Sequence, residues 1–157
     1  ICVRDRECLL GKVVDDQMVL NEAGWIVQQA WDRIPHHFPH AMTDAFIVMP
    51  NHIHSIIEIT DPVGATHASP LQTTGTDGPR GPVPGSLSAI VGSFKSASAR
   101  RINAVLGTTG SPFWQRNYYE HIVDDDDEMN RIRDYIANNP YTWDTDEDNL
   151  LQITTRR

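Results

Sequence analysis

The chain has 157 residues, of which 39% are hydrophobic, so it can bury one core and is too short for two comfortable domains. Its net charge of −8 would argue against a nucleic-acid partner if the acidic residues were evenly spread. They are concentrated in 124–148, whereas 87–122 carries more basic than acidic side chains. The global charge therefore does not decide the partner, and we predict a single domain over 1–157.

Membrane and disulfide-rich classes are disfavoured. No apolar run approaches the roughly 20 residues that span a bilayer, and no basic-then-apolar signal segment opens the chain. Cys2 and Cys8 have no other cysteine or metal-type spacing around them, which indicates neither a disulfide framework nor a zinc site. We expect a soluble protein of a reducing, bacterial-type cytoplasm with no membrane partner.

The first elements are a hairpin and a helix. Residues 8–20 (CLLGKVVDDQMVL) predict two short strands around a turn at Asp15 and Asp16. Asn21 is a good N-cap, and the apolar residues that follow have helical spacing as far as Pro35. This helix is predicted to place its apolar stripe in the core.

Two strands follow in the stretch AFIVMPNHIHSIIEI. The apolar runs 45–49 and 53–59 predict strands that meet around Pro50 and Asn51, and 1–4 has the character of a strand end.

The region 60–85 is rich in Pro, Gly, Thr and Ser and has almost no large apolar residue, which predicts a long flexible loop. Helical spacing resumes at 87–107 with Ser86 as the cap. The segment 114–123 (WQRNYYEHIV) suits a short strand.

The last predicted helix covers 124–138 and ends at Pro140. Carboxylates in its first turn interact favourably with the free N–H groups there, which explains the acidic run 124–128 better than a metal site does. The residues predicted to face inward are Met129, Ile132 and Ile136.

The order of elements predicts the fold class. Strands fill the first half, a helix follows each pair, and no regular βαβ rhythm with Gly-rich turns is present. We therefore predict an α+β sandwich in which helices cover an antiparallel sheet mainly on one face.

His52 and His54 are the first candidates for chemistry. Residues two apart in a strand point to the same face, so both imidazoles would lie side by side, which is the spacing of a two-histidine metal clamp. The alternative is one surface histidine and one packed histidine.

Tyr135 and Asn139 are the second pair. They are four residues apart in a predicted helix and therefore share a face, so a phenol and an amide oxygen would project together. The alternative is an aromatic residue at the core edge and a C-terminal cap before Pro140.

Together, PNHIH, WQRNYYEHIV and DYIANNP resemble the single-tyrosine HUH transposases, and most closely the REP-associated tyrosine transposases. The resemblance extends from the region 4–7 to Trp143, apart from the Pro/Gly-rich loop. It implies a ferredoxin-like core with the histidine pair on a central strand and a nucleophilic tyrosine on a C-terminal helix.

Carried over by position, the resemblance makes His52 and His54 metal ligands, Tyr135 the nucleophile, and Asn139 the helix residue that completes the metal site. Other members carry glutamine at the position of Asn139. The implied cofactor is Mg²⁺ or Mn²⁺, and the implied reaction is cleavage and strand transfer of single-stranded or hairpin DNA through a 5′-phosphotyrosine link. The site could be built within one chain or across a homodimer.

Other residues are candidates for contact with DNA or for nucleophilic attack. Basic side chains on 87–122 are candidates for phosphate contacts, with ordinary helix-surface charge as the alternative. Tyr118 and Tyr119 compete with Tyr135 but suit core packing or stacking on DNA bases better, and His121 is a candidate third imidazole. The predicted DNA-binding residues are Lys95, Arg100, Arg101, Arg116 and Tyr119.

The sequence leaves two alternative functions open. A metal-dependent phosphoesterase would use the same histidines to activate water and would release its product without a covalent adduct. A domesticated hairpin-DNA-binding module would keep the fold and bind tightly without cleavage.

Overall fold

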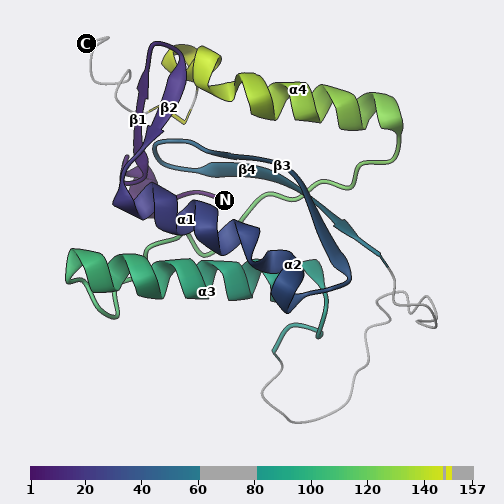
Figure 1. Cartoon of the computed structure of the whole chain (residues 1–157), viewed down its shortest axis with the longest axis horizontal. Coiled ribbons are helices and arrows are strands. Elements are labelled where there is room, and N and C mark those ends of the chain that lie inside the picture. Colours follow the sequence, from purple (N-terminus) through teal and green to yellow (C-terminus); the bar gives the residue numbers. More distant parts are fainter. Residues whose placement is uncertain (61–80, 147, 150–157) are drawn as a thin grey trace.

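The computed structural model describes residues 1–60, 81–146, 148 and 149 (Figure 1). It confirms the predicted α+β class. The strands are β1 (Gly11–Val14), β2 (Gln17–Leu20), β3 (Ala41–Val48) and β4 (Ile53–Ile59). The helices are α1 (Glu22–Asp32), α2 (Ile34–His37), α3 (Leu87–Leu106) and α4 (Asp126–Thr142), with 3-10 turns η1 (Arg4–Arg6) and η2 (Trp143–Thr145). Most of the predicted loop 60–85 lies outside the described residues.

The sheet that carries the histidines has the strand order of a ferredoxin-like sandwich. β3 and β4 form an antiparallel pair, and single antiparallel bridges join Cys2 to His52 and Val3 to Trp114. The order across the sheet is therefore the segment at Trp114, the N-terminal segment, β4 and β3. The strand predicted over 114–123 is wrong beyond this one bridge, because the rest of the segment has no neighbour in strand pairing.

Helices cover the two faces of this sheet differently. α1 and α3 pack together on one face, and α4 crosses the other (Figure 1). Trp31 of α1 stacks on Phe46 of β3 at a centroid distance of 4.4 Å and meets Phe94 of α3 edge-on at 6.2 Å. Large aromatic side chains bury much apolar area and add about 0.5–1.5 kcal/mol per pair, so this cluster fixes both helices to the core face.

A β-bulge in β3 changes which side chains face α4. Thr43 pairs with Ile57 and Phe46 with Ser55, so β3 has one more residue than β4 between these pairs. The extra residue keeps Thr43 and Phe46 on the core face and lets Asp44 point to the opposite face. There its carboxylate accepts hydrogen bonds from Arg133 of α4.

The predicted caps Asn21 and Ser86 are confirmed, whereas α4 begins at Asp126, two residues later than predicted. Asn21 accepts a hydrogen bond from the Gly24 N–H, Ser86 accepts one from the Ala89 N–H, and the acidic run caps α4 through Asp125, which accepts from the Glu128 N–H. The predicted hairpin turn at 15–16 joins β1 to β2.

The predicted end of the last helix at Pro140 is wrong. α4 continues to Thr142, although proline removes one backbone donor and restricts the preceding residue. Asn139 and Pro140 are both buried, so packing holds them in helical geometry against their local preference. None of the helices in the described ranges has the length and apolarity needed to cross a bilayer.

Candidate metal and nucleophile site

His52 and His54 lie side by side on the face of the sheet that α4 covers. His54 pairs with Ile47 in the β3–β4 register, one position away from Phe46, so it points away from the aromatic cluster. The two imidazole centroids are 4.7 Å apart, and the rings meet at 78°. His52 is 1% exposed and His54 is half-buried. The strand alternation thus brings both rings together, as the sequence predicted.

Burial holds both imidazoles in their neutral form. It lowers the pKa of His52 to about 3, repulsion between the protonated forms of the two histidines lowers it further, and the nearby side chain of Asn139 raises it. Burial likewise lowers the pKa of His54 to about 4, against the carboxylate of Asp146, which raises it. Neutral imidazole is the form that offers a lone pair to a metal ion.

Asn139 contributes buried polar atoms that have no protein partner. Its side chain is fully buried, and neither Oδ1 nor Nδ2 has a hydrogen bond within the described part of the chain. His52 Nε2 is likewise buried without a hydrogen-bond partner in the described part of the chain. An unsatisfied buried polar atom costs about 1–3 kcal/mol, and Asn139 lies close enough to the His52 ring to raise its pKa, so these three atoms are suited to coordinate a bound ion. Because α4 continues to Thr142, Asn139 is not a C-terminal cap.

This donor set fits a divalent cation. Two neutral imidazoles and an amide oxygen suit Mn²⁺, and they suit Mg²⁺ if water fills the remaining positions. Within the described ranges, no group of three His, Cys, Asp or Glu side chains could hold a metal. The third protein donor to such an ion would therefore be the amide oxygen of Asn139.

Tyr135 stands one helical turn before Asn139, with its ring against that of His54. Its ring centroid lies 5.2 Å from that of His54, with the planes at 75°, and the side chain is 53% exposed. The competing tyrosines lie elsewhere. Tyr119 is 87% exposed on the segment before α4, and the Tyr118 hydroxyl lies 3.5 Å from Ser88 Oγ of α3. His121 contacts Glu128 rather than the other histidines.

An open pocket of about 670 Å³ runs along α4 beside Tyr135. A tyrosine at its wall with an exposed side chain can meet a large substrate directly. The lining residues are Arg131, Asp134, Tyr135, Asn138, Thr142, Thr145, Asp146 and Asp148.

The predicted DNA-binding residues are not brought to this site. Lys95, Arg100 and Arg101 lie on α3, across the sheet from α4 (Figure 1). The Lys95 ammonium donates to the backbone carbonyls of Gln115 and Arg116, and Arg101 donates to Gln29 of α1. Arg100, Arg116 and Tyr119 are exposed. Contact of these residues with DNA stays a prediction.

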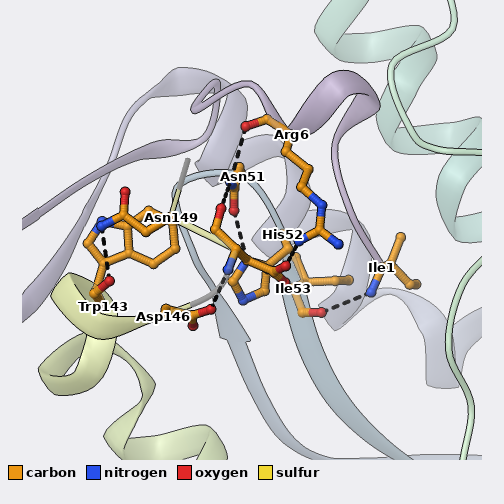
Figure 2. A network of polar contacts seen from close by, with 9 residues as sticks. Ile1, Arg6, Asn51, His52, Ile53, Trp143, Asp146 and Asn149 are labelled. Carbon is orange, nitrogen blue, oxygen red and sulfur yellow. Dashed lines mark hydrogen bonds and ion pairs between the residues drawn. The ribbon is translucent and has the colours of Figure 1, made fainter. Parts of the chain in front are cut away.

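The structure also places residues behind His52 that the sequence did not single out for a role. Asn51 is fully buried, with Oδ1 2.8 Å from His52 Nδ1, and the Trp143 ring lies 6.0 Å from the His52 ring (Figure 2). Asp148 lies on the same side, where its carboxylate pairs with Arg6. Asn51 directly precedes His52, and in the sequence its pairing with Pro50 indicates only where two strands meet. No sequence signal separated Asp148 from its acidic neighbours.

Comparison with known proteins gives two matches. Residues 80–139 match the family model described as "Transposase IS200 like", a segment that contains Tyr135 and Asn139 and begins after the histidine pair. The chain is also 39% identical to an uncharacterized protein of Haemophilus influenzae over 150 aligned residues. The alignment covers 94% of this chain and 81% of the relative. Among solved structures, none matches significantly.

Proposed function

We propose that this chain is an enzyme of the IS200-like transposase family that cuts and rejoins single-stranded DNA through Tyr135. The match of residues 80–139 to the family model supports this proposal. His52, His54 and Asn139 would hold the divalent ion that this reaction uses. The proposal includes the REP-associated subtype and a hairpin-bearing substrate, which the motifs PNHIH, WQRNYYEHIV and DYIANNP support.

One observation carries the proposal. A single chain places the Tyr135 ring 5.2 Å from His54, and the His54 ring 4.7 Å from His52. Tyr135 is exposed to a substrate, whereas His52 and Asn139 below it are buried with unused polar atoms. A tyrosine beside a buried set of neutral donors can supply both the attacking oxygen and the ion ligands for metal-assisted phosphoryl transfer.

Each protein group has a defined part in binding the ion. His52 offers Nε2, His54 offers its neutral imidazole, and Asn139 offers Oδ1 from one turn below Tyr135. When bound, Mg²⁺ or Mn²⁺ would polarise the scissile phosphate and offset the charge that develops on its oxygens.

The covalent step conserves the energy of the phosphodiester. The Tyr135 phenolic oxygen forms a bond to phosphorus while the bond from phosphorus to the 3′ oxygen breaks. The phenolic proton is released, and the departing 3′ oxygen takes up a proton as a free 3′-hydroxyl. A second 3′-hydroxyl can then attack the 5′-phosphotyrosine, restoring the phenol and joining the DNA to a new strand.

The test is a search for the covalent adduct. The protein is incubated with Mn²⁺ or Mg²⁺ and labelled hairpin oligonucleotides taken from the DNA that flanks its own gene. We expect a labelled protein band that survives denaturant, is absent with EDTA and is absent in Tyr135→Phe. The matched controls Tyr118→Phe and Tyr119→Phe retain the band.

Other outcomes would contradict the proposal in distinct ways. Cleaved DNA without a band would indicate attack by water. Tight binding without cleavage in any metal would indicate a binding module. A band lost in Tyr119→Phe but kept in Tyr135→Phe would move the nucleophile.

A further inference from the structure

The buried amide of Asn51 contacts two backbone carbonyls and the ring of His52. Asn51 Nδ2 donates to the backbone carbonyl of Arg6 at 3.1 Å and to that of Asp148 at 2.6 Å. Its Oδ1 lies 2.8 Å from His52 Nδ1. Figure 2 shows Asn51 between Arg6 and His52, with dashed lines along these contacts.

The orientation of this amide follows from its partners. Both groups that face Nδ2 are backbone carbonyls, which can only accept hydrogen bonds. A flipped amide would place Oδ1 against two carbonyl oxygens and lose both bonds in a buried position. Oδ1 therefore faces His52, and because an amide oxygen only accepts, His52 Nδ1 must carry the hydrogen.

Among the described residues, the Asp148 carboxylate does not compete for this hydrogen. The nearest carboxylate oxygen of Asp148 is 3.8 Å from Nδ1, which is too long for a hydrogen bond, and the other oxygen of that carboxylate pairs with Arg6. In a neutral imidazole with Nδ1 protonated, Nε2 has a lone pair and no hydrogen. Nε2 is the His52 atom that is buried without a partner in the described residues.

We propose that Asn51 is a positioning residue that holds His52 in the Nδ1–H tautomer and so prepares Nε2 as a metal donor. The tautomer rests on the hydrogen bonds alone, whereas the use of Nε2 for a metal rests on the proposed function. A histidine that is already in the correct tautomer and ring orientation binds an ion without first rearranging. Partners of metal ligands that act in this way typically change metal affinity by about 10–100-fold.

The first test needs no substitution and no metal. The EDTA-treated protein is labelled with ¹⁵N at histidine, and two-bond ¹H–¹⁵N correlation spectra at neutral pH identify which ring nitrogen of His52 carries hydrogen. The expected spectrum shows Nδ1 protonated and Nε2 bare. A His52 protonated at Nε2 would overturn the inference whatever the enzyme does to DNA.

The second test uses variants and Mn²⁺ binding. Asn51→Ala is expected to bind Mn²⁺ about 10–100-fold more weakly and to show mixed tautomers. Asn51→Asp keeps an acceptor beside Nδ1 and should keep the wild-type tautomer. The matched control is Asn103→Ala, because Asn103 is also a buried amide with hydrogen bonds on both ends, to Ser111 and Thr108, but lies on α3.

The results separate the inference from the proposed function. Folded Asn51→Ala with wild-type Mn²⁺ affinity would overturn it, as would folded Asn51→Asp with Nε2 protonated. If Asn103→Ala loses as much Mn²⁺ affinity as Asn51→Ala, the role of Asn51 is structural only. That result would also overturn the inference. If the wild type binds no Mn²⁺ although His52 has Nδ1 protonated, the metal-dependent function fails while the tautomer assignment is supported.

Discussion

Asp44 and Arg133 join the sheet to the helix that carries Tyr135. Arg133 Nε lies 3.1 Å from one carboxylate oxygen of Asp44, and Nη2 lies 2.5 Å from the other. This two-point contact fixes angle as well as distance. The β3 bulge presents Asp44 to α4, and Tyr135 follows Arg133 by two residues, so the ion pair helps to set where the phenol stands over His54.

Breaking this ion pair should affect the reaction more than stability. Exposed ion pairs contribute little to the free energy of unfolding, whereas a displacement of about 1 Å in a reacting group can cost about 100-fold in rate. We expect Asp44→Ala to form the DNA adduct about tenfold or more slowly, with a nearly unchanged unfolding midpoint in urea.

The charge-reversed pair is the control for this prediction. Asp44→Arg combined with Arg133→Asp should recover part of the lost rate, because the contact can form in reverse. Wild-type kinetics in Asp44→Ala would show that the ion pair does not position α4.

The histidine pair should make the metal-free protein sensitive to acid. Folding lowers the pKa of His52 to about 3 and that of His54 to about 4, from about 6.5 in the unfolded chain. Below pH 6.5 the unfolded state therefore binds more protons, so the stabilisation is fully present above that pH and is lost as pH falls toward the folded values. We expect a loss of about 2 kcal/mol for each histidine between pH 7 and pH 5, on the order of 4 kcal/mol for the pair.

Urea unfolding in EDTA measures this loss. The His52→Gln/His54→Gln double variant should lose distinctly less stability over the same pH interval, because the groups that titrate are gone. Equal pH dependence in the two proteins would mean that the imidazoles are not held neutral by burial.

Replacement of Asn139 should weaken metal binding without lowering the free energy of unfolding. Its buried amide atoms have no hydrogen-bond partner among the described residues, so an apolar side chain of similar size removes their desolvation cost. We expect Asn139→Leu to be as stable as the wild type without metal, or about 1 kcal/mol more stable. It should bind Mn²⁺ at least tenfold more weakly. A variant that unfolds readily in EDTA would show that Asn139 has a structural role instead.

Lys95 should behave as a structural residue. Its ammonium donates to the carbonyls of Gln115 and Arg116, in a position where burial lowers its pKa. We expect Lys95→Met to lose about 1.5–3 kcal/mol of unfolding free energy, the range for hydrogen bonds to charged groups. The exposed Arg100→Gln should unfold like the wild type. If Lys95→Met unfolds normally and flattens the salt dependence of DNA binding, Lys95 is a phosphate contact instead.

Local chemistry explains which parts of the fold were predictable. Asn21 and Ser86 cap helices through their own neighbours, and the turn at 15–16 joins strands that are adjacent in sequence. The strand predicted over 114–123 forms only one bridge, from Trp114 to Val3, more than one hundred residues earlier. Local sequence does not show how far such a distant pairing extends. The helix through Pro140 was missed because the burial that holds it is a tertiary effect.

The candidate site also has parts that local sequence predicts and parts that depend on tertiary packing. The shared face of His52 and His54 follows from strand alternation, and that of Tyr135 and Asn139 follows from helix geometry. The approach of the two pairs depends on how α4 docks, which involves the bulge at Asp44, and periodicity does not reveal it. Asn51 and Asp148 meet behind His52 only after three distant segments have packed together.

Peptide mapping of the protein–DNA adduct tests the central claim most directly. The adduct formed with Mn²⁺ and a hairpin oligonucleotide is digested with nuclease and trypsin, and the residue that carries the nucleotide is identified by fragmentation in mass spectrometry. Trypsin cleaves after Arg133, so Tyr135 lies in a different peptide from Tyr118 and Tyr119. We predict a phosphodiester-linked nucleotide on Tyr135. A nucleotide on Tyr118 or Tyr119, or cleaved DNA with no modified tyrosine, would contradict the account.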